Sequence, residues 1–234
     1  MAGGRALVVG VTGGIGAEVT RLLESGGTCV HGIDDRVAPQ AGHRWTVDIA
    51  QAGGQAFASW LHDYLERNGV PDMFAWCAGL YDRTDLADYG MSRLQTMLDA
   101  NLTAFLLACR ALLAARRRSP RPLRMAVVGS QAGVTGGRDA VYAAAKAGCV
   151  AAVKSIAREY ARSGVQANVV SPGPTRTPMN SVMGERQAYY ENAIPAGRFN
   201  TAEEVASVVV WLLTTAPLTI NGATMDVDGG LVRR

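Results

Sequence analysis

Cysteine and histidine, two side chains that often bind transition metals, are scarce in this sequence of 234 residues. The four cysteines and three histidines form no CxxC or other spacing typical of a metal site. They are Cys29, Cys77, Cys109, Cys149, His31, His43 and His62. A chain of this length does not need disulfides to stabilise its core. We therefore expect four reduced, buried thiols and no metal ion.

Charge of one sign is also limited, because the formal net charge is only +3. A balance this weak does not favour binding to nucleic acid or to a membrane surface. No uninterrupted apolar run reaches the roughly 18 residues needed to span a bilayer. The first strand-like run starts at Ala6, which leaves no room before it for a signal peptide. We expect a cytoplasmic protein that acts on a small molecule, with no nucleic-acid or membrane partner.

What the sequence does have is glycine, at 27 residues, and a regular alternation of short apolar runs with longer helical patterns. The predicted strands are residues 6–9, 28–33, 45–47, 73–77, 125–128, 165–170 and 223–227. The predicted helices are residues 15–24, 51–67, 91–117, 140–162 and 201–213. Apolar strands that alternate with helices predict one α/β domain over residues 1–234. We expect a Rossmann-like, doubly wound fold: a seven-stranded parallel sheet with helices on both faces.

A glycine-rich turn, Gly10-Val-Thr-Gly-Gly-Ile-Gly16, joins the first strand to the first helix. Glycine lets the backbone turn sharply and approach a ligand closely, and a helix N-terminus favours a phosphate group. The spacing is G-x-x-x-G-x-G rather than the common G-x-G-x-x-G, so the position of the turn between strand and helix supports the prediction. The pattern indicates a dinucleotide site.

Asp34 ends the second predicted strand. A carboxylate there can accept hydrogen bonds from the adenosine ribose and would repel a 2′-phosphate, which favours NAD over NADP. Two alternatives stay open. Arg36 could serve a phosphate, and Asp34 with Asp35 could form an ordinary acidic turn.

Tyr142 and Lys146 are four residues apart in a predicted helix and therefore lie on one face. A phenol is a poor base at neutral pH, but a nearby ammonium stabilises the phenolate and lets the pair transfer a proton. Ser130 follows the fifth strand, at the edge of the sheet where ligands bind. Asn101 is an amide among apolar residues, which indicates either a polar task or a bend in the helix.

Taken in their order along the chain, these motifs resemble those of the short-chain dehydrogenase/reductase superfamily, in its short, non-extended branch. The resemblance covers almost the whole chain. The further matching segments are Asp48-Ile49, Cys77-Ala78-Gly79, Asn101-Leu102, Gly129-Ser130, and residues 168–173, 177–179, 196–198, 201–205, 221–222 and 227–230. Each motif is loose, but together they are specific.

The resemblance implies an NAD(P)-dependent oxidoreductase in which Tyr142 is the general acid or base. It implies that Lys146 favours the phenolate and bonds the nicotinamide ribose, and that Ser130 orients the substrate oxygen. Asn101 would hold a water that relays protons toward Lys146.

The resemblance also implies a set of cofactor contacts. These residues would contact the pyrophosphate, the adenine, the ribose, the carboxamide and the remaining phosphate of the cofactor. They are Gly10, Thr12, Gly14, Ile15, Gly16, Asp48, Ile49, Ala78, Gly79, Pro172, Gly173, Thr175 and Thr177. A substrate loop is expected at about 179–195. A homotetramer or homodimer is expected to form through the two long helices.

Two residues depart from the family pattern. Val9 stands where the family usually has Thr, and Cys77 stands where it usually has Asn. Both usual residues support backbone geometry near the cofactor, so these departures affect cofactor affinity rather than the reaction. The gap from Ser130 to Tyr142 is also one residue shorter than expected.

Three functions remain open from the sequence. The first is an NAD-preferring enzyme that interconverts a secondary alcohol and a ketone. The second is an NADPH-dependent reductase of a 3-oxoacyl or polyketide-type ketone. The third is a catalytically idle dinucleotide-binding sensor or scaffold. Candidate substrate contacts are Tyr81, Gln131, Val134 and Met179, which predict a mostly apolar pocket.

Overall fold

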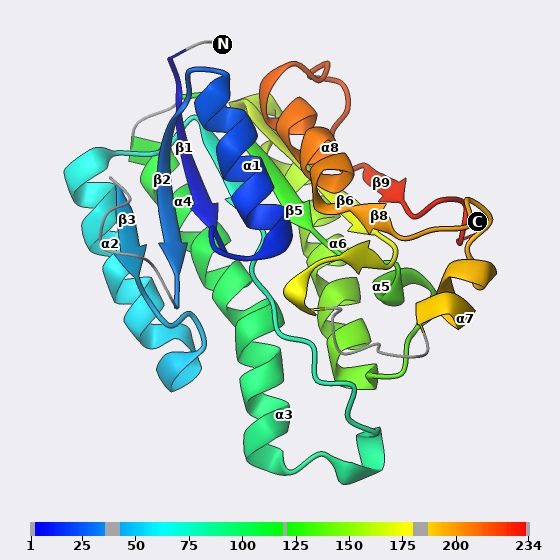
Figure 1. Ribbon diagram of the computed structural model, residues 1–234. Coiled ribbons are helices and arrows are strands. Elements are labelled where there is room, and N and C mark those ends of the chain that lie inside the picture. Colours follow the sequence, from blue (N-terminus) through cyan, green and yellow to red (C-terminus); the bar gives the residue numbers. More distant parts are fainter. Residues whose placement is uncertain (1–2, 36–42, 119–120, 180–186, 233–234) are drawn as a thin grey trace.

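The computed structural model describes residues 3–35, 43–118, 121–179 and 187–232. Seven parallel strands form one sheet in the order β3-β2-β1-β4-β5-β6-β9 (Figure 1). The strands are β1 (Arg5–Val9), β2 (Cys29–Asp34), β3 (Arg44–Thr46), β4 (Met73–Trp76), β5 (Leu123–Val128), β6 (Val165–Pro172) and β9 (Thr224–Val227). The chain order reverses at β1, because β2 lies on one side of it and β4 on the other. Ligands bind at such a switch point in doubly wound sheets.

Helices cover both faces of the sheet. On one face lie α2 (Gln55–Asn68), α4 (Ala104–Arg118) and α6 (Ala140–Tyr160), whose apolar side chains join one buried cluster. On the other face lie α1 (Gly14–Ser25) and α8 (Ala202–Thr214), which form a second cluster (Figure 1). The predicted α/β class, with seven parallel strands and helices on both faces, is confirmed.

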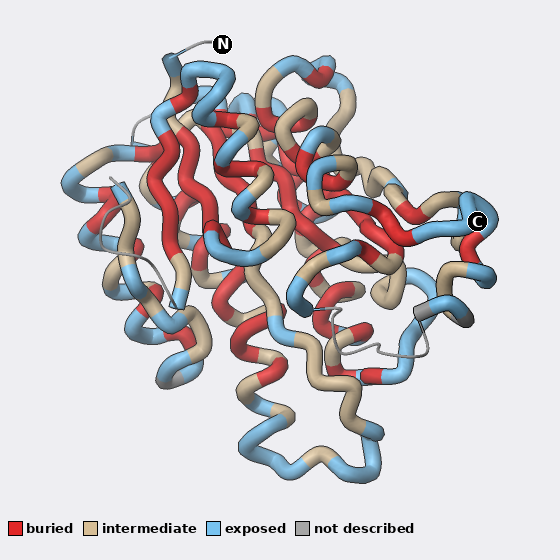
Figure 2. The backbone as a smooth tube through the Cα atoms, viewed as in Figure 1, coloured by how far each residue is buried: buried red, intermediate tan, exposed pale blue. Residues whose placement is uncertain are grey.

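The central strands are apolar at every position because both of their faces are covered. In β1, Leu7 and Val9 belong to one buried cluster and Val8 to the other, and all three are fully buried. Each such side chain stabilises the fold by about 1.5–3 kcal/mol relative to exposure. Figure 2 shows this burial running through the middle of the sheet.

The long helix predicted at 91–117 is interrupted. The structure has α3 (Met91–Leu98), a π-helical turn η3 (Asp99–Thr103) and then α4. A π-helical turn inserts one residue into the helical ladder and is common at functional sites. Asn101 lies at its centre, and the sequence did not predict this π-helical turn.

Several short elements lie outside the predicted set. The helix predicted at 51–67 begins as the 3₁₀ turn η1 (Gln51–Gly54). The others are η2 (Leu86–Asp88), α5 (Ala132–Thr135), η4 (Ala161–Ser163) and α7 (Gln187–Ala193), with a two-stranded sheet of β7 (Thr175–Arg176) and β8 (Asn200–Thr201). They lie in the loops, where sequence periodicity carries little information.

Two helical stretches, Met91–Arg118 and Ala140–Ser163, are long and apolar enough to cross a membrane by length and composition alone. Both pack against the sheet, and 56% and 44% of their apolar windows are buried inside the fold. Asn101 and Lys146 are buried within them. Their apolar character is therefore that of core helices.

Candidate active site

The glycine turn brings the N-terminus of α1 against the ends of β1 and β4. Gly10 has a φ of +91°, and a Cβ there would lie 2.7 Å from the amide nitrogen of Ala78. A Cβ on Gly16 would lie 1.9 Å from the carbonyl oxygen of Gly10. Both positions therefore require glycine. The first turn of α1 carries no acidic residue, and Gly13 supplies no side-chain cap, so its amides are available to a pyrophosphate.

Thr177 lies directly over this turn. A Cβ on Gly14 would lie 2.7 Å from Cγ2 of Thr177, so the Thr177 side chain packs against the Gly14 backbone and leaves no room for a side chain there. Thr177, Ile15 and Thr175 all line the cavity that Ser130, Tyr142 and Lys146 also line. The predicted cofactor contacts Thr175 and Thr177, from the C-terminal part of the chain, therefore lie beside those predicted in the glycine turn.

The predicted adenosine contacts also come together. The Thr12 amide donates a hydrogen bond of 2.8 Å to Oδ2 of Asp34. The Val47 amide donates to the Asp34 carbonyl at 2.8 Å, which brings Asp48 and Ile49 to the same edge. Burial is the main cause of a raised pKa at Asp34.

Asp48 caps its own turn by accepting a hydrogen bond of 2.9 Å from the Ala50 amide. Arg36, the alternative phosphate contact, lies outside the described residues, as do residues 180–186 of the predicted substrate loop.

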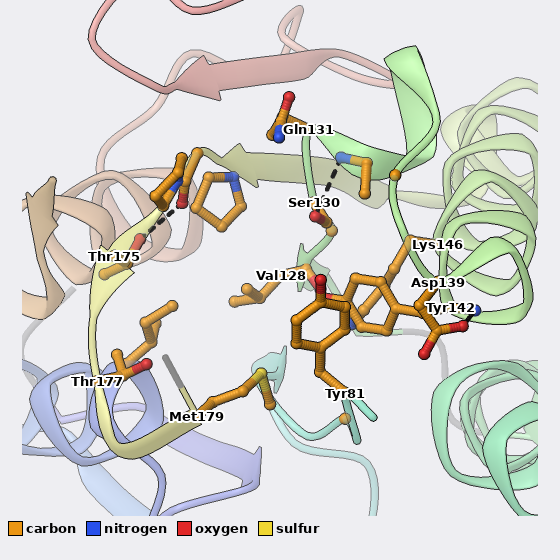
Figure 3. Close-up of a pocket in the computed structure, with 18 of the residues that line it drawn as sticks. Tyr81, Val128, Ser130, Gln131, Asp139, Tyr142, Lys146, Thr175, Thr177 and Met179 are labelled. Carbon is orange, nitrogen blue, oxygen red and sulfur yellow. Dashed lines mark hydrogen bonds between the residues drawn. The ribbon is translucent and has the colours of Figure 1, made fainter. Parts of the chain in front are cut away.

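Ser130, Tyr142 and Lys146 line one cavity of about 300 Å³, together with Ala78, Gly79, Pro172 and Gly173. Lys146 is 3% exposed, and its Nζ donates a hydrogen bond of 3.0 Å to the Val128 carbonyl. The same Nζ lies 5.6 Å from the ring centroid of Tyr142. Oγ of Ser130 accepts a hydrogen bond of 3.1 Å from the Ala132 amide, and Figure 3 shows Ser130, Tyr142 and Lys146 grouped in the same part of the pocket. Phenol, ammonium and hydroxyl therefore face one space.

Asn101 lies beside this group but not on the cavity surface. Its Oδ1 accepts a hydrogen bond of 3.2 Å from the Leu80 amide, and its Nδ2 donates to the carbonyls of Leu80 and Met97, both at 2.9 Å. A Cβ on Gly79 would lie 2.7 Å from Oδ1 of Asn101 and 3.2 Å from Nζ of Lys146. The amide thus fixes the loop after β4 against Lys146. The water that Asn101 is expected to hold stays a prediction.

Asp139 is a site residue that sequence reasoning missed. It is fully buried, and its Oδ1 accepts a hydrogen bond of 2.9 Å from the Tyr142 amide. Its Oδ2 accepts a 2.8 Å bond from the Tyr89 hydroxyl. Burial and this carboxylate raise the pKa of Tyr89 to about 12. An aspartate three residues before Tyr142 is a helix-cap pattern, so the sequence did carry the signal.

The substrate end of the cavity is lined by both apolar and charged side chains. Tyr81, Gln131 and Met179 line it, and the rings of Tyr81 and Tyr142 are 5.0 Å apart. Arg83 and Arg138 line it as well. Val134, the fourth expected contact, is instead 41% exposed and lies outside this lining. The lining as a whole is mostly apolar, as expected, but the sequence did not predict these two cations.

The two departures from the family pattern meet in the structure. The Cys77 amide donates a hydrogen bond of 2.8 Å to the Val9 carbonyl. Burial raises the pKa of Cys77 to about 12, so its thiol stays neutral at physiological pH. Cys77 therefore acts as a small apolar residue in the cavity wall.

Several known proteins are similar to this chain over most of its length. A family model described as enoyl-(acyl carrier protein) reductase matches residues 10–232. The 3-oxoacyl-[acyl-carrier-protein] reductase MabA of Mycobacterium tuberculosis is 35% identical over 96% of this chain and 91% of its own. The FabG reductase of the same description from Escherichia coli is 30% identical over 97% and 96%.

Solved structures agree with this assignment. A short chain dehydrogenase/reductase family oxidoreductase from Burkholderia thailandensis has a TM-score of 0.85 and 32% identity, and covers 99% of this chain and 94% of its own. A putative 2-deoxy-d-gluconate 3-dehydrogenase from Agrobacterium tumefaciens, solved with bound NADP, has a TM-score of 0.89 and 26% identity, and covers 99% and 97%. The chain therefore belongs to the short-chain dehydrogenase/reductase superfamily of NAD(P)-dependent oxidoreductases.

Proposed function

We propose that this chain reduces the ketone of a 3-oxoacyl thioester to a secondary alcohol, with Tyr142 as the acid. The observation that carries the proposal is the meeting of Ser130, Tyr142 and Lys146 around one cavity. The cavity opens beside the glycine turn, whose amides suit a pyrophosphate. The 3-oxoacyl class is supported by the names of the similar reductases.

The chemistry is divided between cofactor and protein. When bound, the nicotinamide cofactor supplies the hydride that reaches the carbonyl carbon. The Ser130 hydroxyl donates a hydrogen bond to the carbonyl oxygen and orients it. The Tyr142 hydroxyl gives its proton to that oxygen as the alcohol forms. The buried ammonium of Lys146 stabilises the phenolate that remains, and solvent restores the proton. In the oxidation direction the same phenolate accepts the proton.

Three structural features support this assignment of roles. Lys146 donates one N–H to Val128, which fixes its position and leaves two N–H groups for other acceptors. Asp139 caps the helix at the Tyr142 amide and so holds the phenol in place. Asn101 holds the Gly79 loop against Lys146. Asp139 and Asn101 act here as positioning residues.

For the cofactor we propose NAD(H). The Asp34 carboxylate lies at the end of β2, bonded to the turn that would face the adenosine phosphate. A second negative charge there would be repelled. The NADP of the Agrobacterium structure belongs to a protein 26% identical to this one, so the local carboxylate is the better guide for this chain.

Tyr142→Phe tests the assignment, with Tyr160→Phe near the C-terminal end of the same helix as the control. A 3-oxobutanoyl thioester and a plain aliphatic ketone serve as substrates, and NAD(P)H absorbance reports turnover. We expect Tyr142→Phe to lower kcat by about 10²–10⁴-fold and to leave the Kd for the cofactor within about twofold. Tyr160→Phe keeps full activity. Substantial turnover by Tyr142→Phe would reject the role of the phenol.

The same assay distinguishes the other two candidate functions. A preference for the plain ketone over the thioester would favour a general alcohol–ketone oxidoreductase. Tight cofactor binding without turnover of any carbonyl would favour an idle sensor. The cytoplasmic location stays a prediction, which cell fractionation tests. The homodimer or homotetramer formed through α3–α4 and α6 also stays a prediction, which solution scattering tests.

A further inference from the structure

Three metal-ligating side chains meet at the edge of the sheet, away from the active site. They are Cys29, His31 and His43. Cys29 and His31 are alternate residues of β2 and so point to one face. Gly32 pairs with Arg44 across β2 and β3, which places His43 beside His31. The possible ligand atoms of the three residues lie within 4.8 Å of one another. The expectation of four buried thiols is wrong for Cys29, which is exposed.

This cluster is separate from the catalytic chemistry. Cys29 begins β2, whereas Asp34 ends it at the cofactor edge. Five strand steps correspond to roughly 16 Å. A metal bound here would therefore touch neither the cofactor contacts nor the cavity that holds Tyr142.

His31 is the fixed member of the cluster. It is 5% exposed, and its Nδ1 lies 3.0 Å from the Tyr64 hydroxyl. Metal-binding histidines commonly have one ring nitrogen held in this way, which orients the ring and leaves the other nitrogen for the ion. The ring of Trp45 lies 5.4 Å away and forms a rigid wall beside it.

Cys29 and His43 are the adjustable members, because both side chains are exposed. The rings of His31 and His43 are stacked, with centroids 4.5 Å apart and an angle of 27° between their planes. An imidazole binds a metal in its own plane, so His43 has to rotate out of this stack. Tetrahedral zinc with Zn–N and Zn–S distances of about 2.0 and 2.3 Å brings ligand atoms to within about 3.3–3.6 Å of one another. Exposed side chains can make this movement.

The nearby cations do not block the cluster. The guanidinium of Arg44 pairs with Glu24 and donates to the Val30 carbonyl at 2.5 Å. The guanidinium of Arg5 donates to the carbonyls of Gly69 and Val70. Both cations are thus directed at acceptors. A thiolate at Cys29, formed by loss of its proton to solvent, would add the negative charge that a divalent ion needs.

We infer that Cys29, His31 and His43 bind one Zn²⁺ ion, with water as the fourth ligand. One thiolate and two imidazoles suit a borderline-soft divalent cation and do not suit Mg²⁺ or Ca²⁺, which prefer oxygen. The ion would connect β2 to the edge strand β3. The three ligands come together only in the folded chain. The ion would therefore bind the folded state and stabilise it against unfolding.

The test uses purified, reduced, metal-free protein of full length, first with Co²⁺ as a spectroscopic probe and then with Zn²⁺ by calorimetry. We expect one equivalent of each ion and a near-ultraviolet sulfur-to-cobalt charge-transfer band, which only a thiolate ligand gives. Cys29→Ser should abolish that band and weaken Zn²⁺ binding by at least about tenfold. His43→Gln should weaken binding by a similar factor.

His62→Gln is the matched control, because His62 is an exposed histidine of α2 outside the cluster. It should bind both ions as the unaltered protein does. Cys29 and His43 are exposed, so their variants should fold, which near-ultraviolet circular dichroism verifies. The inference is overturned if no stoichiometric binding occurs, if the cobalt band is missing, or if Cys29→Ser and His43→Gln bind like the control. These outcomes do not depend on turnover, so they are independent of the proposed reductase activity.

Discussion

The amide of Thr12 donates a hydrogen bond to Oδ2 of Asp34, across 22 residues of sequence. This bond ties the glycine turn to the end of β2 and places a carboxylate where the adenosine ribose of a dinucleotide would lie. We therefore expect the choice between NAD and NADP to depend mainly on this one side chain.

Asp34→Ser should shift the cofactor preference toward NADP. Removal of the carboxylate removes the repulsion of a 2′-phosphate, and a change of about 1.4 kcal/mol corresponds to tenfold. We expect the ratio of the Kd values, NADP over NAD, to fall by about tenfold or more. Fluorescence titration with both reduced cofactors measures it. Asp35→Ser, which removes the adjacent charge, is the control and should change the ratio much less. Equal effects of the two substitutions would contradict the prediction.

The glycine turn offers a steric test with a control three residues away. A Cβ on Gly16 would lie 1.9 Å from the Gly10 carbonyl oxygen, whereas a Cβ on Gly13 would meet nothing closer than 3.5 Å. Gly16→Ala therefore has to displace the start of α1. We expect it to weaken cofactor binding by more than about tenfold, because the helix amides move away from the pyrophosphate. Gly13→Ala should bind the cofactor nearly normally, as titration of both variants would establish.

Asn101 is expected to matter for both stability and catalysis. Asn101→Ala leaves the amide of Leu80 and the carbonyls of Leu80 and Met97 without their side-chain partner. Each buried polar group left without a hydrogen-bond partner lowers the free energy of unfolding by about 1–3 kcal/mol. We expect a lower free energy of unfolding in urea and a lower kcat, because the Gly79 loop is no longer held against Lys146. Asn68→Ala removes one amide bond, to the Tyr64 carbonyl at the end of α2, and should leave kcat unchanged.

The sequence could predict most of the fold because its strongest signals are local. Apolar runs at β1 and β6 and long helical patterns gave the elements, and their alternation gave the parallel sheet. The position of Tyr142 and Lys146 on one helix face was likewise a matter of spacing. The π-helical turn at Asp99–Thr103 was missed because it inserts one residue without changing the hydrophobic pattern much.

Contacts between elements were harder to predict than the elements themselves. Cys29, His31 and His43 have no recognisable ligand spacing, since the pairing of β2 with β3 is what brings them together. The cations Arg83 and Arg138 were missed for the same reason, because they enter the cavity from two separate loops. In both cases the residue types are visible in the sequence, whereas their meeting depends on tertiary structure.

The N-terminus of α8 should make the protein sensitive to acid. Glu204 forms a capping box with Thr201, accepting a 2.8 Å bond from the Thr201 amide, and pairs with Arg198. The hydrogen bonds from Arg198, and then that from Thr201, lower the pKa of Glu204 to about 2. Its pKa in the unfolded chain is about 4.3. Because the folded value is the lower one, the stability that this carboxylate contributes is present above about pH 4.3 and is lost as pH falls toward 2.

Glu204→Gln isolates this contribution. The amide keeps an acceptor for the Thr201 amide but cannot pair with Arg198 or titrate, so the variant should be less stable at pH 7 and should lose less stability than the unaltered protein between pH 4.3 and 2. Glu203→Gln is the control, because Glu203 is exposed, makes only a surface pair with Arg21, and has no part in the cap. Urea unfolding at several pH values measures the difference. If Glu203→Gln flattened the acid loss as much as Glu204→Gln, the capping box would not be its source.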